Sequence, residues 1–158
     1  MTKKFNQYIG KAGHLAVMSE FLMWGWNVAT PEVDVGDDIF VVKDDDGTLR
    51  KIQVKTSSKT ERQTSYSGQF MIPLKQLRNI SNILIHYVFI LRLENTWSKP
   101  VIIRPDYMLD LFETGKTGPE HDGNLNLYFS FIDGKIICSE NDFTKYVSDF
   151  SDFPIIEH

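Results

Sequence analysis

Stretches of apolar residues alternate with short polar segments, and their lengths distinguish helices from strands along the chain. The longest stretch, residues 10–26, has apolar side chains at almost every position around a helix. Beyond Lys11, Glu20 is the only formally charged side chain of this segment. Gly25 predicts the end of the helix, and residues 26–31 predict a short extended segment. The pattern therefore predicts a first helix that is covered on most sides.

Two apolar strands are expected next, at residues 39–42 and 51–56. Asp44-Asp45-Asp46-Gly47 lies between them and is typical of a hairpin turn, so the strands are expected to pair antiparallel. Side chains alternate between the faces of a strand, which places Gln53 and Lys55 on the same side. The hairpin therefore presents an amide and an amine together.

The remaining segments predict more strands than helices. Further strands are expected at residues 69–72, 83–93, 101–103, 125–132 and 135–138. Helical segments are expected at residues 74–79 and at 105–112, where Pro105 suits the first turn. Ser139-Glu140-Asn141-Asp142 resembles a capping box and predicts a terminal helix. Residues 56–68 and 113–124 are polar and are expected to form loops.

Composition limits the class of protein. With 158 residues, 42% hydrophobic and 13% aromatic, the chain is expected to form one domain over residues 1–158. It has no apolar run long enough to span a bilayer and no apolar segment typical of a secretory signal near its start. We therefore expect no membrane partner and a cytoplasmic location. One cysteine, Cys138, excludes an intramolecular disulfide and a cysteine-rich zinc site, and its apolar neighbours predict a buried thiol.

The charge balance narrows the expected partners. Seventeen basic and twenty-one acidic residues give a net charge of −4, which argues against a protein that coats nucleic acid without specificity. A nuclease is compatible with this charge, because it needs only local carboxylates and a local basic patch.

Candidate chemistry lies at the start of the predicted hairpin. The acidic pair Asp37-Asp38 precedes its first strand, and antiparallel pairing is expected to bring Asp38 beside Lys55. A carboxylate, the Gln53 amide and an amine at one place are the groups of a divalent-metal phosphodiesterase. The alternative is a structural ion pair between Asp38 and Lys55, because a charge inside a sheet needs a partner.

The polar loop at residues 56–68 offers candidate contacts to DNA. Lys59, Arg62 and Tyr66 stand there among hydroxyl residues, and basic and aromatic side chains suit contact with a DNA backbone. The same composition also describes an ordinary solvated loop.

A series of short motifs occurs in order along the first third of the chain. They are Gly10-x-x-Gly13, Gly25-Trp26-Asn27-Val28, Pro31, Asp38-Ile39-Phe40-Val41 and Gln53-Val54-Lys55-Thr56. In order and spacing they resemble the PD-(D/E)xK nuclease superfamily, in particular its branch of Holliday-junction-resolvase-like and homing endonucleases. The resemblance implies an α/β fold: a restriction-endonuclease-like core with a mixed central sheet flanked by helices and a metal site at one edge.

The resemblance also implies roles for individual residues. Asp38 matches the metal-binding aspartate, Gln53 a position held by Glu, Asp or sometimes Gln, and Lys55 the lysine of the family. The implied metal is magnesium, with manganese as an alternative, and the implied partner is DNA. A homodimer would supply the two sites that cutting both strands of a duplex requires.

The first helix departs from the family pattern. Relatives carry an additional glutamate near its start, and the spacing back from Gly25 places His14, not Glu20, at that position. Glu20 is six residues further on, about 600° around the helix, so the two side chains point to different sides. His14 as an imidazole ligand or phosphate contact, or Glu20, would complete the site. Glu20 could equally face solvent or pair with a cation.

Two functions are therefore expected. The first is a metal-dependent DNA endonuclease that hydrolyses phosphodiester bonds. The alternative is a catalytically weakened module of the same fold that binds DNA or a protein partner.

Overall fold

The computed structural model describes residues 2–33, 38–79 and 85–158. Asp37, one member of the acidic pair, lies outside the described residues, as do the first two residues of the strand expected at 83–93.

Helix α1 (Lys3–Met23) begins seven residues earlier than the apolar pattern predicts. The Thr2 hydroxyl accepts a hydrogen bond from the Phe5 backbone N–H at 3.3 Å, which caps the first turn. The early turns are exposed, so the hydrophobic pattern does not mark them. After the helix, Gly25 has a φ of +85°, a conformation that favours glycine.

The central sheet is mixed, as expected. It contains β1 (Asn27–Ala29), β2 (Ile39–Lys43), β3 (Thr48–Ser58), β6 (Ile85–Arg92) and β7 (Val101–Ile103), in the order β1-β2-β3-β6-β7. Strands β3 and β6 run parallel, and the other neighbours run antiparallel. The α/β class and the β2–β3 hairpin are therefore confirmed.

A second, antiparallel sheet and two short helices complete the fold. The sheet contains β4 (Thr60–Glu61), β5 (Tyr66–Pro73), β8 (Glu120–His121), β9 (Asn124–Ile132), β10 (Lys135–Cys138) and β11 (Asn141–Asp142). The helices are α2 (Leu74–Leu77) and α3 (Pro105–Glu113), and a 3₁₀ turn covers Thr144–Tyr146. Among the described helices, none is long and apolar enough to cross a membrane.

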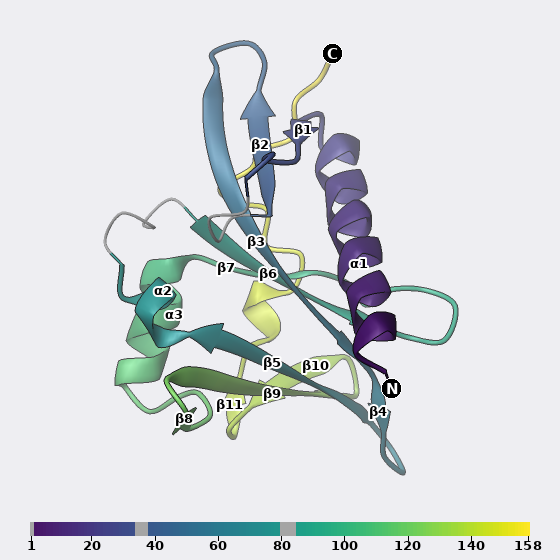
Figure 1. Ribbon diagram of the computed structural model, residues 1–158, viewed down its shortest axis with the longest axis vertical. Coiled ribbons are helices and arrows are strands. Elements are labelled where there is room, and N and C mark those ends of the chain that lie inside the picture. Colours follow the sequence, from purple (N-terminus) through teal and green to yellow (C-terminus); the bar gives the residue numbers. More distant parts are fainter. Residues whose placement is uncertain (1, 34–37, 80–84) are drawn as a thin grey trace.

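The alternation of side chains along β6 sorts the core into two layers. Val88 and Ile90 belong to the cluster under α1, whereas Tyr87 and Phe89 belong to the cluster that joins the two sheets. Figure 1 shows α1 along one side of the central sheet and the second sheet on the other. The expectation of a sheet flanked by helices is thus met on one face, while the second sheet, with α2 and α3, covers the other.

Two predicted segments differ from the structure. The loop expected at residues 56–68 is largely strand, because β3 continues to Ser58 and β4 and β5 form a hairpin. Thr, Ser and Tyr suit strands as well as loops, so polarity alone is a poor guide there. The helix expected after Ser139 is absent from the described residues: Ser139 and Glu140 both have positive φ, and the chain turns back into β11.

Candidate functional site

The site forms where α1, β2 and β3 meet, around the carboxylate of Asp38. Its Oδ2 accepts hydrogen bonds from Gln53 Nε2 and from the Val54 backbone N–H, each at 2.7 Å. His14 Nε2, from α1, lies 3.6 Å from the same oxygen. The Asp38 side chain is only 11% exposed, so these N–H groups replace the water that a carboxylate would otherwise bind.

The strand register determines which residue lies directly across from Asp38. Lys43 pairs with Thr48 across the turn, and Ile39 pairs with Ile52. One step further, the backbone N–H of Asp38 donates to the Ile52 carbonyl at 2.8 Å, which places Asp38 opposite Gln53 rather than Lys55. The four-residue turn fixes this register.

Gln53 links Asp38 to a residue that the sequence analysis missed. Its Oε1 accepts a hydrogen bond from Gln76 Nε2 of α2 at 2.8 Å, while its own Nε2 donates to Asp38. Gln53 is 8% exposed, so both ends of its amide are held in a nearly buried chain. No local sequence pattern predicts the role of Gln76, because only the tertiary fold brings α2 next to Gln53.

Close packing of α1 on β3 brings His14 to the site. Gly13 is buried, and a Cβ at this position would lie 2.1 Å from the Thr56 methyl group. Gly10, one turn earlier, has a more distant contact of 3.9 Å with the Thr56 hydroxyl. The Gly10-x-x-Gly13 motif therefore has a physical reason: its second glycine lets the helix backbone approach the strand.

The two remaining candidate residues, Lys55 and Glu20, have different positions relative to Asp38. Lys55 follows Gln53 by two residues on β3, is partly buried, and pairs in register with Phe89. Alternation along the strand gives Lys55 the same face as Gln53. Glu20 is exposed and lines a hollow with Trp97 and Lys99, so the structure does not bring its side chain to Asp38.

The three candidate DNA contacts have different surroundings. Lys59 Nζ pairs with Glu61 and, at 3.2 Å, with Glu94, and the hydrogen bond to Glu61 raises the pKa of this lysine. Arg62 is exposed in the turn between β4 and β5. Tyr66 stacks on Phe131 with ring centroids 4.8 Å apart. The two carboxylates beside Lys59 weaken its electrostatic attraction for a phosphate, whereas Arg62 is exposed to solvent.

A groove begins one residue beyond Lys55. It has a volume of about 530 Å³ and is lined by Asn6, Ile9, Thr56, Ser57, Ser58, Thr60 and Gln69. The same turns of α1 expose Lys3, Lys4 and Lys11. The sequence analysis missed these lysines as a group, although their grouping near the start of the helix is visible in the sequence.

The donor set for a metal is small. Asp38 is the one carboxylate in the described cluster, with the Gln53 amide and the His14 imidazole beside it. Among residues 2–33, 38–79 and 85–158, no group of three or more His, Cys, Asp and Glu side chains is placed to hold a metal ion. Any ion bound here would therefore rely on amide oxygen and water as well as on Asp38.

Comparison with known proteins gives a fold-level relationship. No protein-family model matches the chain, and no curated protein matches it. Among solved structures, a bacterial homing endonuclease, I-Ssp6803I, is similar with a TM-score of 0.58. The alignment covers 95% of this chain and 90% of that chain at 18% sequence identity. The chain thus shares the fold of that endonuclease over almost its whole length.

Proposed function

We propose that this protein is a divalent-metal-dependent DNA endonuclease whose site comprises Asp38, Gln53, Lys55 and His14. One observation carries the proposal. The Asp38 carboxylate is held at 2.7 Å by Gln53, with Lys55 two residues further on the same strand face, in a fold shared with a homing endonuclease. The PD-(D/E)xK motifs combine the same residue types, which supports a catalytic role for this nearly buried carboxylate.

The side chains fit one divalent cation such as Mg²⁺ or Mn²⁺. Asp38 would supply a carboxylate oxygen, and Gln53 would supply its amide oxygen after rotating by half a turn. After that rotation Gln76 can still hydrogen-bond Gln53, because the Gln76 amide can also turn and accept where it now donates. The bound ion would polarise the phosphate and lower the pKa of the attacking water. His14, an imidazole near the carboxylate, suits Mn²⁺ better than Mg²⁺.

The remaining polar groups act on the phosphate. The Lys55 ammonium stabilises the negative charge that develops on the phosphate oxygens during hydrolysis. His14 replaces a carboxylate of the family pattern, so the site loses one negative charge that would repel the DNA backbone. The same replacement weakens the hold on a cation.

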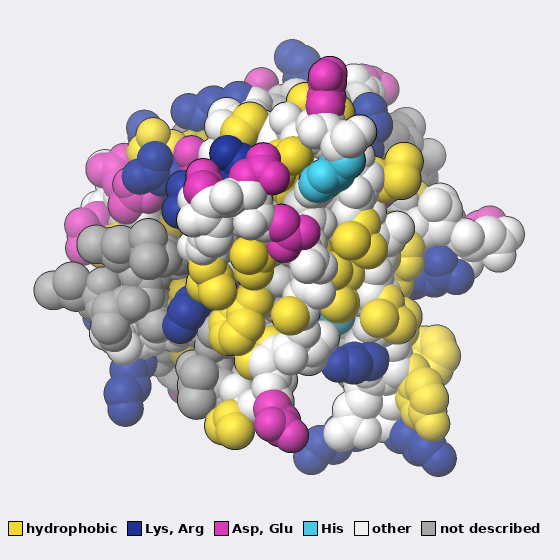
Figure 2. All heavy atoms as spheres, turned by 90° about the horizontal axis from the view of Figure 1, so that it is seen from above, with side chains coloured by type: hydrophobic (Ala, Val, Ile, Leu, Met, Phe, Trp, Pro, Cys, Tyr) yellow, Lys and Arg dark blue, Asp and Glu magenta, His cyan; other side chains and the backbone are white. Residues whose placement is uncertain are grey.

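The groove beyond Lys55 supports a DNA path along α1 and β3. Its hydroxyl and amide groups can hydrogen-bond phosphate and sugar oxygens, and Lys3, Lys4 and Lys11 add positive charge on the same turns. Figure 2 views the opposite end, with the β2–β3 hairpin, where basic (dark blue) and acidic (magenta) side chains are both spread over the face. The N-terminal half of α1 is therefore the favoured contact surface.

The proposal is tested by cleavage of supercoiled, linear and branched DNA with Mg²⁺ or Mn²⁺. The parent is expected to cleave at least one of these substrates, and Lys55→Ala is expected to lose most activity while still binding DNA. Lys116→Ala, a change at an exposed lysine far along the chain, is the matched control and should cleave like the parent. Equal activity of Lys55→Ala and the parent would remove Lys55 from the mechanism.

A second candidate, a nuclease-fold module that binds DNA or a protein without cutting, is favoured by one observation. The site has His14 and Gln53 where acids would strengthen metal binding, so the described residues supply a single carboxylate. This candidate predicts no metal binding by calorimetry, no cleavage with either metal, and retained binding of DNA or protein. Metal binding that depends on Asp38 would exclude it.

A further inference from the structure

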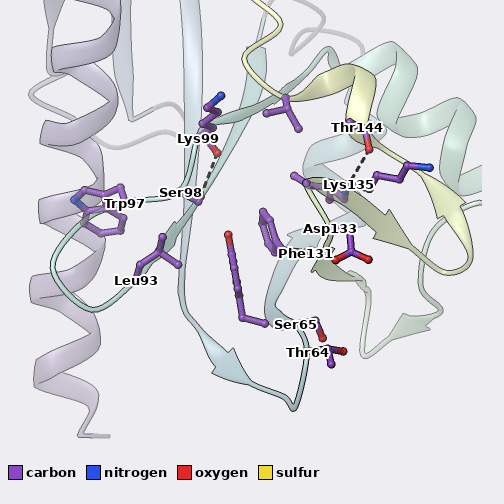
Figure 3. A pocket seen from close by; sticks show the side chains of 14 residues that line it. Thr64, Ser65, Leu93, Trp97, Ser98, Lys99, Phe131, Asp133, Lys135 and Thr144 are labelled. Carbon is purple, nitrogen blue, oxygen red and sulfur yellow. Dashed lines mark hydrogen bonds between the residues drawn. The ribbon is translucent and has the colours of Figure 1, made fainter.

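A second cavity lies away from Asp38, between the antiparallel sheet and the connection from β6 to β7. Its volume is about 530 Å³, within the range of roughly 300–1,000 Å³ typical of small-molecule sites. Figure 3 shows that its lining side chains come from separate segments: the turn before β5, the residues after β6, the β9–β10 hairpin and the 3₁₀ turn. None of the residues assigned to the candidate metal site lines it.

Aromatic rings form part of its wall. Tyr66 stacks on Phe131 with an angle of 14° between the rings, so each ring has one face covered by the other. Trp97 borders the cavity as well, but its ring packs against the core under α1 and has the Arg92 guanidinium 5.6 Å from its centre. Flat apolar surfaces of this kind accept a planar aromatic group by stacking.

Ammonium and hydroxyl groups accompany these rings. Lys99 and Lys135 are exposed and line the cavity from different segments, and in Figure 3 the Lys135 side chain points away from the rings. Within the described part of the chain, neither ammonium lies within 4.0 Å of a carboxylate, although the Lys135 charge helps to lower the pKa of Asp142. The Thr144 hydroxyl accepts the Ile136 N–H at 3.1 Å and donates to the Asp142 carboxylate, which lowers the pKa of Asp142. The flexible lysine stems can swing their charges toward an anion.

We propose that this cavity binds one nucleotide, with the base against the Tyr66–Phe131 stack and the phosphate at Lys99 and Lys135. Stacking surfaces combined with cationic side chains are the chemistry by which proteins hold unpaired nucleotides. A purely apolar ligand would leave both ammonium groups unused, and inorganic phosphate would leave the rings unused. The nucleotide is either free or an unpaired unit of a DNA strand, and the second source depends on the proposed function.

The experiment compares dTMP with thymidine, which has the same base and sugar but no phosphate. Calorimetry in metal-free buffer is expected to show dTMP binding about tenfold more tightly than thymidine, since the phosphate adds charge-assisted contacts. The Lys99→Ala/Lys135→Ala double variant is expected to bind dTMP as weakly as thymidine. Lys75→Ala/Lys116→Ala, a change at two exposed lysines outside the cavity, should bind dTMP like the parent. Thermal unfolding verifies that both variants are folded.

DNA binding separates the two sources. If dTMP does not bind, a duplex with a single-stranded overhang is expected to bind more tightly than a blunt duplex, and the Lys99→Ala/Lys135→Ala variant should abolish that preference. Failure of both dTMP and the overhang to bind overturns the proposal, as does equal binding of dTMP and thymidine. Lys55→Ala should leave these results unchanged, so absence of cleavage and absence of nucleotide binding remain distinguishable.

Discussion

The contact between Asp38 and Gln53 gives the sharpest prediction, because an amide and a carboxylate differ by one charge at almost the same size. Gln53→Glu would replace the 2.7 Å hydrogen bond to Asp38 Oδ2 with two facing carboxylates. Both side chains are nearly buried, at 8% exposure for Gln53 and 11% for the side chain of Asp38. Solvent therefore screens the new repulsion only weakly.

The size of the effect follows from the distance. Two unit charges roughly 3.5 Å apart repel by about 5 kcal/mol at an effective dielectric constant of about 20. Uptake of one proton by the pair relieves part of this repulsion, so we expect the free energy of unfolding to fall by about 2–4 kcal/mol at neutral pH. The introduced carboxyl is harder to ionise in the folded state than in the unfolded state. The loss should therefore shrink as pH falls and the pair becomes protonated.

Urea unfolding of the parent and Gln53→Glu at pH 7 and pH 5, with EDTA or with Mn²⁺, measures these terms. Mn²⁺ should restore much of the lost stability, because it binds the paired carboxylates of the folded state. Gln69→Glu makes the same chemical change at an exposed position of β5 and should be nearly neutral in every condition. If Gln53→Glu were as stable as the parent in EDTA at pH 7, the contact between residues 38 and 53 would not be as described.

Three further predictions test the packing and the buried groups. Gly13→Ala should lower the free energy of unfolding by about 1–3 kcal/mol because the added methyl group would clash with Thr56, and the higher helix propensity of alanine should offset a small part of this loss. Gly10→Ala should be neutral or stabilising, and urea unfolding compares the two variants. Burial raises the pKa of the Cys138 thiol, so labelling by a thiol reagent should be slow in the native protein and fast in urea. Burial also lowers the pKa of His86, against the opposing effect of Asp152 at 2.9 Å. Stability should therefore fall as pH drops below about 6.5, and more steeply in Asp152→Asn; an unchanged pH profile would contradict the burial argument.

The sequence was most informative where a short local pattern determines the structure. The Asp44–Gly47 turn joins two apolar strands, and the expected hairpin is present. The buried thiol of Cys138 and the helix from Pro105 also agree with expectation. Each of these features depends on a few consecutive residues, so no knowledge of the tertiary fold is needed to predict it.

Long-range placement was less predictable. Periodicity gave the shared face of Gln53 and Lys55 but not the partner of Asp38, which the turn length and register decide. Gln76 reaches Gln53 from a helix that begins more than twenty residues later, and no local signal predicts that contact. The segment after Ser139 shows that a local pattern can also mislead. Its capping-box pattern predicts a helix, but Ser139 and Glu140 have positive φ and the chain returns to the sheet as β11.

The central claim is that the Asp38 carboxylate and the Gln53 amide hold a divalent cation for phosphodiester hydrolysis. Its most direct test is an anomalous difference map from crystals of the parent and of Asp38→Asn soaked in Mn²⁺. The account predicts a peak beside the Asp38 carboxylate in the parent, within reach of the Gln53 amide, and no peak there in the variant. An empty site in the parent, or a peak that persists unchanged in Asp38→Asn, would contradict it.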